Sequence, residues 1–132
     1  MLINRKNRGF TLVEIMIVVA IIALLAAIAV PGFLRARKRA QGTTVKNDLR
    51  LIDAAKDQYA IEYNKTIVTP VVADLTPYFK SNSRLGSGVA SLLDIFGNAY
   101  VINDLNTLPS IDAGTKAGLS DVCDATFFSP FQ

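Results

Sequence analysis

The chain has 132 residues, of which 51% are hydrophobic and 19% charged, and it contains no His, no Trp and one Cys. This length suits one small domain, and the absence of His excludes Ser/His/Asp and Cys/His triads and His-ligated zinc. The net charge of +3 comes from Arg5, Lys6 and Arg8, since residues 10–132 carry 11 basic and 11 acidic side chains. We therefore expect no nucleic-acid partner, which would need a basic face on the folded part.

A long apolar block follows this basic start. Between Phe10 and Leu34 the only ionisable side chain is Glu14, and residues 15–30 contain no polar side chain. As a helix, these 25 residues extend about 37 Å at roughly 1.5 Å per residue, enough to cross a bilayer. Because the block is apolar on every side, lipid or copies of the chain must surround it.

Three interpretations of this N-terminus are open at this point. In a secretory signal, Ala27-Ile28-Ala29 is the small-residue cleavage site, but the apolar stretch is longer than in such signals. In a plain membrane anchor, Glu14 is an unexplained cost of about 2 to 3 kcal/mol. In the third, a cut between Gly9 and Phe10 frees an α-amino group about 6 Å along a helix from Glu14. This amine, on the same or a neighbouring chain, neutralises the carboxylate and sets the axial register of adjacent helices.

One set of residues combines a basic start, a possible cut after a small residue, a single acid and a long apolar run. It consists of Arg8-Gly9-Phe10-Thr11-Leu12-Val13-Glu14, the apolar run and Pro31. This set resembles the prepilin N-terminus shared by type IV pilins and the pseudopilins of type II secretion, over roughly residues 1–40. Two later segments are similar to segments of major pseudopilins, namely Asp74-Leu75-Thr76-Pro77-Tyr78 and Asp94-Ile95-Phe96-Gly97-Asn98-Ala99-Tyr100.

The resemblance implies a structural subunit of a type IV pilus or a type II secretion pseudopilus, with no enzymatic activity and no cofactor of its own. Residues 1–9 are then a leader peptide and residues 10–34 a hydrophobic transmembrane and assembly helix. Residues 35–132 form a pilin-like globular domain that includes the second half of the long helix.

The resemblance also assigns roles and partners. A prepilin peptidase cuts between Gly9 and Phe10 and methylates the amine of Phe10, and Glu14 is the assembly contact. Before assembly, the subunit lies in the lipid of the inner membrane with its C-terminal domain outside the cytoplasm. An inner-membrane assembly platform then builds it, with copies of itself, into a periplasmic or cell-surface filament.

The apolar pattern becomes one-sided in the next part of the chain. Apolar side chains recur there at spacings of three, four or seven, at Val45, Leu49, Ile52, Tyr59 and Tyr63. This periodicity predicts an amphipathic helix. We therefore expect one long helix from about Phe10 to about Tyr63, with a bend or local unwinding at Pro31-Gly32 and a weak point at Gly42.

The remaining elements are short. Residues 66–72 predict an extended connection, and residues 75–79 a helix of about one turn that Asp74 caps. Residues 81–91 predict a surface loop. We expect strands at 99–102, 107–111 and 126–128, a turn at 103–106, and a helix in preference to a loop at 113–122, with Asp112 as its cap.

These elements predict an α+β fold, in which the second half of the long helix packs on a small antiparallel sheet. We expect Phe127, Phe128 and Phe131 to cover the core, and Cys123 to be a small buried hydrophobe that has no partner for an intrachain disulfide.

Two charged groups are candidate binding sites. The basic cluster, Arg35, Arg37, Lys38 and Arg39, directly follows the apolar block and suits contact with lipid headgroups. The basic cluster also leaves an alternative function open, in which the chain is a membrane-anchored module that binds DNA or lipid through residues 35–39. Positive charge flanks the block on both sides, so the positive-inside rule gives no orientation. The late acids match no dense calcium-binding loop, and we expect them to be solvated in preference to binding calcium; they are Asp94, Asp104, Asp112, Asp121 and Asp124.

Overall fold

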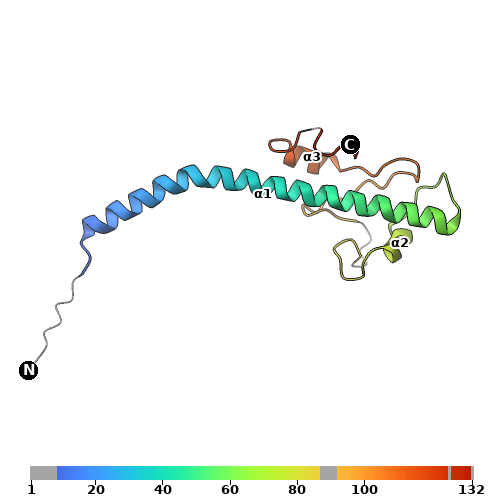
Figure 1. The fold of residues 1–132 in the computed structure, drawn as a ribbon, viewed down its shortest axis with the longest axis horizontal. Helices are drawn as coiled ribbons and strands as arrows, with labels where there is room; N and C mark the ends of the chain where they lie inside the picture. The colour runs from blue at the N-terminus through green and yellow to red at the C-terminus, as the bar shows by residue number, and fades with distance from the viewer. Residues whose placement is uncertain (1–8, 87–91, 125, 132) are drawn as a thin grey trace, which may run out of the picture. The chain divides into compact units, whose positions relative to one another are not determined.

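A computed structural model describes residues 9–86, 92–124 and 126–131. The helices in this part of the chain are α1 (Leu12–Tyr63), α2 (Val72–Leu75), the short 3-10 helix η1 (Thr76–Tyr78) and α3 (Ala113–Leu119). Figure 1 shows α1 as one continuous helix, which confirms the long helix expected from the sequence. The chain divides into two compact units, Met1–Ala36 and Arg37–Gln132, and α1 contributes to both.

The α-helical backbone continues through Pro31 and Gly32. The predicted local unwinding is therefore not found, and the bend at this point stays a prediction. Proline removes one backbone donor and crowds the carbonyl four residues before it. In a helix of 52 residues, the turns on both sides keep their hydrogen bonds, so this single loss does not end the helix.

Gly42 is a packing position, and the expectation of a weak point there is wrong. The helix is unbroken at Gly42, which is buried. A Cβ atom at this position would lie 2.8 Å from the Cys123 Sγ and 3.2 Å from the Phe127 Cε1. The missing side chain therefore lets the C-terminal segment approach the helix closely.

The core lies on one face of the second half of α1. Of the apolar residues predicted to line it, Val45, Leu49, Ile52 and Tyr59 are buried, whereas Tyr63 is 55% exposed. The predicted aromatic cover is confirmed, because Phe128 and Phe131 are buried and Phe127 is partly buried against the core. Ala55 of α1 is buried as well, and the remaining core residues come from the loops and short helices; they are Leu75, Phe79, Leu85, Leu92, Tyr100, Ile111, Leu119 and Cys123.

The expected antiparallel sheet is not confirmed. Instead of strands, the described residues contain two isolated antiparallel bridges, Leu93 with Ala99 and Val101 with Ser110. Asn103 gives the physical reason for the second, because its backbone is left-handed, with a φ of 57°, and its side-chain amide donates to the Leu108 carbonyl that the next rung of the ladder would use. The carbonyls of Ile102 and Thr107 take no part in that ladder and accept hydrogen bonds from the Lys56 ammonium.

The C-terminal segment also differs from expectation. Residues 126–130 form turns in place of the predicted last strand, with backbone hydrogen bonds from Phe127 to Asp124 and from Ser129 to Thr126. These bonds join residues three apart, and they use N–H groups of Phe127 and Ser129 that a strand would donate to a neighbouring strand.

The short helices largely agree with the sequence. Helix α3 begins after Asp112, whose carboxylate accepts the N–H of Gly114, so the predicted cap is confirmed. Helix α2 begins before Asp74, which lies in the first turn and accepts the backbone N–H of Val71. Asp74 therefore caps a helix start as predicted, but it does so from within the first turn and not from the position before the helix. The loop predicted at 81–91 falls partly outside the described residues, and residues 81–86 form turns and a bend.

Candidate functional site

The start of α1 is a reciprocal cap between Thr11 and Glu14. The backbone N–H and the hydroxyl of Thr11 both donate to Oε2 of Glu14, each at 2.8 Å, and the Glu14 N–H donates back to the Thr11 hydroxyl at 3.2 Å. This arrangement is a capping box, in which Thr and Glu three residues apart satisfy backbone donors that the helix leaves free. The Thr-x-x-Glu pattern was a signal for it in the sequence.

Only one of the two oxygens of the Glu14 carboxylate accepts hydrogen bonds in this cap. Both hydrogen bonds from Thr11 go to Oε2, and Oε1 accepts none within the described part of the chain. The second oxygen is therefore open to a further donor.

The peptide bond between Gly9 and Phe10 lies just outside the helix. Both residues are exposed and belong to no regular element, and Phe10 is 83% exposed. A Cβ atom at Gly9 would meet nothing within 4 Å, so no contact in this chain requires glycine there. An exposed backbone of this kind is what a protease needs.

The first half of α1 is uncovered. The large apolar side chains from Leu12 to Leu34 are at least half exposed, and the helix is long and apolar enough by composition to cross a membrane. Glu14 is the only acid among them and lies in the first turn of α1. The described chain therefore presents a bare apolar rod whose one carboxylate marks its end.

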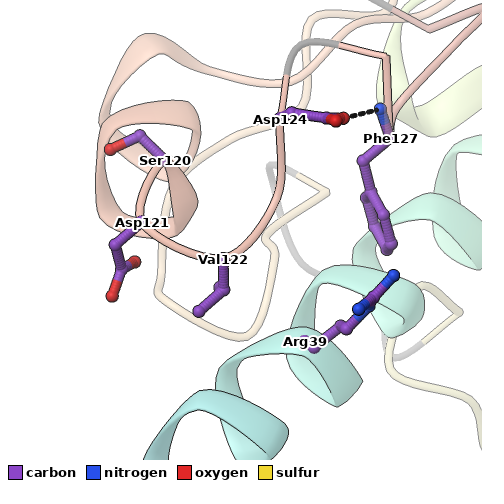
Figure 2. A pocket seen from close by; sticks show the side chains of 6 residues that line it. All are labelled: Arg39, Ser120, Asp121, Val122, Asp124 and Phe127. Carbon is purple, nitrogen blue, oxygen red and sulfur yellow. Dashed lines mark hydrogen bonds between the residues drawn. The ribbon is translucent and has the colours of Figure 1, made fainter.

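The basic cluster divides between two environments. Lys38 forms an ion pair with Asp121 of its own chain, with Nζ 2.8 Å from Oδ2. Arg39 lines a pocket of about 320 Å³, and Figure 2 shows its side chain beside the ring of Phe127. Both partners of the ion pair are about half exposed, so it contributes at most about 1 kcal/mol. Arg35 and Arg37 are exposed and remain available for lipid headgroups.

The late acids are not uniformly solvated, and that expectation is wrong for Asp94. This residue is buried, and its carboxylate accepts hydrogen bonds from the N–H groups of Phe96 and Asn98 and from the hydroxyl of Thr115. Asp94 therefore holds the turn that follows it against α3.

Asp124 borders the pocket of Figure 2 and is held by its neighbours. It accepts hydrogen bonds from the Thr126 hydroxyl and the Phe127 N–H, and these lower the pKa of the Asp124 carboxyl. The part of the chain that the structure describes contains no group of three or more His, Cys, Asp or Glu side chains that suits a metal ion. The expectation that these acids bind no calcium stays a prediction.

Two buried polar groups were missed by sequence analysis. Lys56 is 1% exposed, and burial lowers the pKa of its ammonium, while Asp53, Asp104 and Asp57 oppose this shift. Its position in the amphipathic pattern, one residue after Ala55, places it at the edge of the buried face. No local signal identified its carbonyl partners, which lie more than forty residues later.

Asp48 is the second such group. It is buried, accepts the Tyr100 hydroxyl at 2.7 Å and pairs with Arg84. Burial raises the pKa of Tyr100 to about 12. This network ties α1 to two distant loop segments.

Cys123 is buried, as predicted, and burial raises the pKa of its thiol. Its sulfur packs against the helix at Gly42. A protonated, buried thiol is a packing group, which argues against a nucleophilic role.

Comparison with known proteins finds relatives of two kinds. The model of the prokaryotic N-terminal methylation motif matches residues 4–30. The chain is 31% identical over 104 residues to the type II secretion system core protein G of Escherichia coli K12, an alignment that covers 74% of this chain and 72% of that protein. No solved structure matches the chain significantly.

Two further relatives match less than half of this chain. The chain is 44% identical over 62 residues to the type IV major pilin protein PilA of Myxococcus xanthus, covering 47% of this chain and 28% of that protein. It is 43% identical over 59 residues to the type II secretion system core protein G of Pseudomonas aeruginosa, covering 45% and 42%. The chain thus spans less than half the length of these two relatives. None of these comparisons supports the alternative of a DNA- or lipid-binding module.

Proposed function

Because this chain belongs to the family of type IV pilins and type II secretion pseudopilins, we propose that it is a structural subunit of such a filament. The observation that carries the proposal is the bare apolar half of α1, with Glu14 in its first turn and the exposed Gly9–Phe10 bond just before it. Relatives of both kinds occur, so the proposal covers either filament.

Processing is the first step of the proposed function. A prepilin peptidase cuts between Gly9 and Phe10, removes the leader and methylates the new amine of Phe10. The exposure of both residues and the match to the methylation motif support this step. The chain is acted upon by an enzyme and catalyses no reaction itself.

Membrane insertion comes before assembly. The apolar half of α1 lies in the inner membrane, and Arg35 and Arg37 contact the lipid headgroups beyond it. The domain that follows lies outside the cytoplasm. The length and composition of α1 support the anchor, and the orientation rests on the family.

Assembly exchanges lipid for neighbouring copies around the same apolar surface. An inner-membrane assembly platform brings the subunits together, and apolar contacts alone would leave their axial offset free. The Glu14 carboxylate pairs with the Phe10 amine of the same or an adjacent subunit, and this ion pair forms at one offset only. The free Oε1 of Glu14 supports the role, because the cap with Thr11 and the ion pair are compatible.

The proposal is tested by producing the full chain with a prepilin peptidase and an assembly platform and imaging the cell surface and periplasm by electron microscopy. We expect filaments that contain the chain with the peptidase and none without it. The Glu14→Ala variant is expected to insert into the membrane at least as well as the wild type and to form no filaments. Filaments of ordinary abundance from that variant would refute the role of Glu14.

A further inference from the structure

Helix α1 ends at an asparagine with left-handed backbone. Asn64 directly follows the last helical residue, Tyr63, and has a φ of 48°. The N–H of Lys65 donates to the carbonyl of Ala60 at 3.1 Å. This six-residue closure is a Schellman ending, and asparagine is one of the residues that tolerate its left-handed position.

The chain around Asn64 is open to solvent. Residues 61–69 are all exposed, and residues 64–71 contain no helix or strand. The side-chain amide of Asn64 and the hydroxyl of Thr66 form no hydrogen bond within the described part of the chain. An enzyme can therefore reach both groups without disturbing a buried residue.

The sequence at this exposed turn has a specific form. It reads Glu62-Tyr63-Asn64-Lys65-Thr66, and Asn64 is the one asparagine of the chain that is followed two residues later by Ser or Thr. Asn-x-Ser/Thr is the acceptor pattern for N-linked glycosylation when x is not Pro. Glu62 lies two residues before the asparagine, and we expect its carboxylate to contribute to recognition by the transferase.

Glu62 is accessible despite one contact. Its Oε2 accepts the hydroxyl of Tyr78, and Oε1 accepts no hydrogen bond in the described structure. Three recognition groups, the acid, the amide and the hydroxyl, thus lie on one exposed segment that begins at the last turn of α1.

We propose that Asn64 is the acceptor of an N-linked glycan. The donor is an oligosaccharide carried on a polyprenyl pyrophosphate, and a membrane oligosaccharyltransferase catalyses the transfer. The Asn64 amide nitrogen forms a bond to the anomeric carbon and loses one proton, while the bond from that carbon to the pyrophosphate oxygen breaks and the polyprenyl pyrophosphate leaves. This inference rests on the proposed function, which places the domain on the extracytoplasmic side where such transfer occurs.

The test is mass spectrometry of the full-length mature chain purified from its native cells. Trypsin cuts after Lys56 and Lys65 and releases Asn64 on the peptide 57–65. We expect this peptide to carry the added mass of an oligosaccharide and to release sugar fragment ions. Peptide 57–65 found only in its unmodified form would overturn the proposal.

Variants separate the acceptor from its surroundings. Asn64→Gln and Thr66→Val are expected to abolish the added mass, Thr66→Ser to keep it, and Glu62→Gln to lower its occupancy tenfold or more. The matched control is Asn82→Gln, which changes an exposed asparagine outside the pattern and is expected to leave the glycan intact. A glycan that persists on the peptide in Thr66→Val would contradict the assignment.

The two proposals fail separately. A chain that starts at a methylated Phe10 and builds filaments but carries no glycan would refute only the glycosylation of Asn64. A globular domain found in the cytoplasm would refute both.

Discussion

The Glu14→Gln variant separates the capping role that the structure shows for this side chain from the proposed ion pair with the Phe10 amine. The glutamine carbonyl accepts the same two hydrogen bonds from Thr11, which are 2.8 Å long in the wild type, so the capping box is retained. The negative charge is lost, and the amine of Phe10 is left without its counterion. Removing one partner of a buried ion pair typically costs about 3 to 5 kcal/mol, which is about a hundredfold or more in an assembly equilibrium.

The reverse change is Thr11→Ala. It removes the capping hydroxyl and costs about 1 kcal/mol of helix stability, equivalent to about fivefold in an equilibrium. The charge of Glu14 is unchanged in this variant. We therefore expect Thr11→Ala to lower filament abundance about fivefold at most and Glu14→Gln to lower it about a hundredfold or more.

The assay compares both variants with the wild type in the same cells. Sheared filaments are quantified by immunoblotting, membrane insertion by resistance to alkaline extraction, and processing by gel mobility. Both variants are expected to be inserted and processed normally. The reasoning would be refuted by wild-type filament abundance in Glu14→Gln, or by an equal loss in both variants.

Three further predictions follow from the same structure. Gly9→Leu is expected to block processing, seen as a precursor of lower gel mobility, and normal cleavage would contradict recognition of the small residue. Gly42→Ala places a Cβ 2.8 Å from the Cys123 Sγ and is expected to destabilise the detergent-solubilised mature chain by about 1 to 2 kcal/mol in urea unfolding. Gly118→Ala, where a Cβ meets nothing within 4 Å, is the matched control and is expected to stabilise it by about 0.5 to 1 kcal/mol; equal effects at both glycines would be contrary evidence. Because burial raises the pKa of Tyr100 to about 12, the folded chain keeps this proton where the unfolded chain loses it. Stability should therefore fall as the pH rises from 10 to 12, and Tyr100→Phe should flatten that fall; an unchanged slope would speak against the shift.

Local patterns made α1 and the start of α3 predictable. Its apolar block, the spacing of Val45, Leu49 and Ile52, and the cap at Asp112 are all properties of residues close in the chain, and the structure agrees with each. The candidate site at Gly9, Phe10 and Glu14 was found in the same way, because its residues lie within six positions of one another.

Contacts between distant residues were not predictable from such patterns. Lys56 has a charge typical of a surface residue, yet its ammonium is buried and donates to the carbonyls of Ile102 and Thr107. Asp94 reads as a solvated acid, yet Thr115 makes it a buried acceptor. In both cases the hydrogen-bonding partner of the buried group lies far along the chain, and a single sequence does not identify that partner.

The role of Gly42 shows the same limit. A glycine inside a helix pattern indicates weakness by its propensity alone. The close approach of Cys123 at that point gives the glycine a packing reason, and only the folded chain displays it.

The first residue of the mature chain distinguishes the proposed filament subunit from a secreted domain and from an uncut membrane anchor. The decisive measurement is the mass of the mature protein and of its N-terminal peptide, isolated from native membranes or filaments. We predict a chain that starts at Phe10 and carries one added methyl group on its amine, with the apolar half of α1 retained. A chain that starts at Val30, or one that still starts at Met1, would contradict the account.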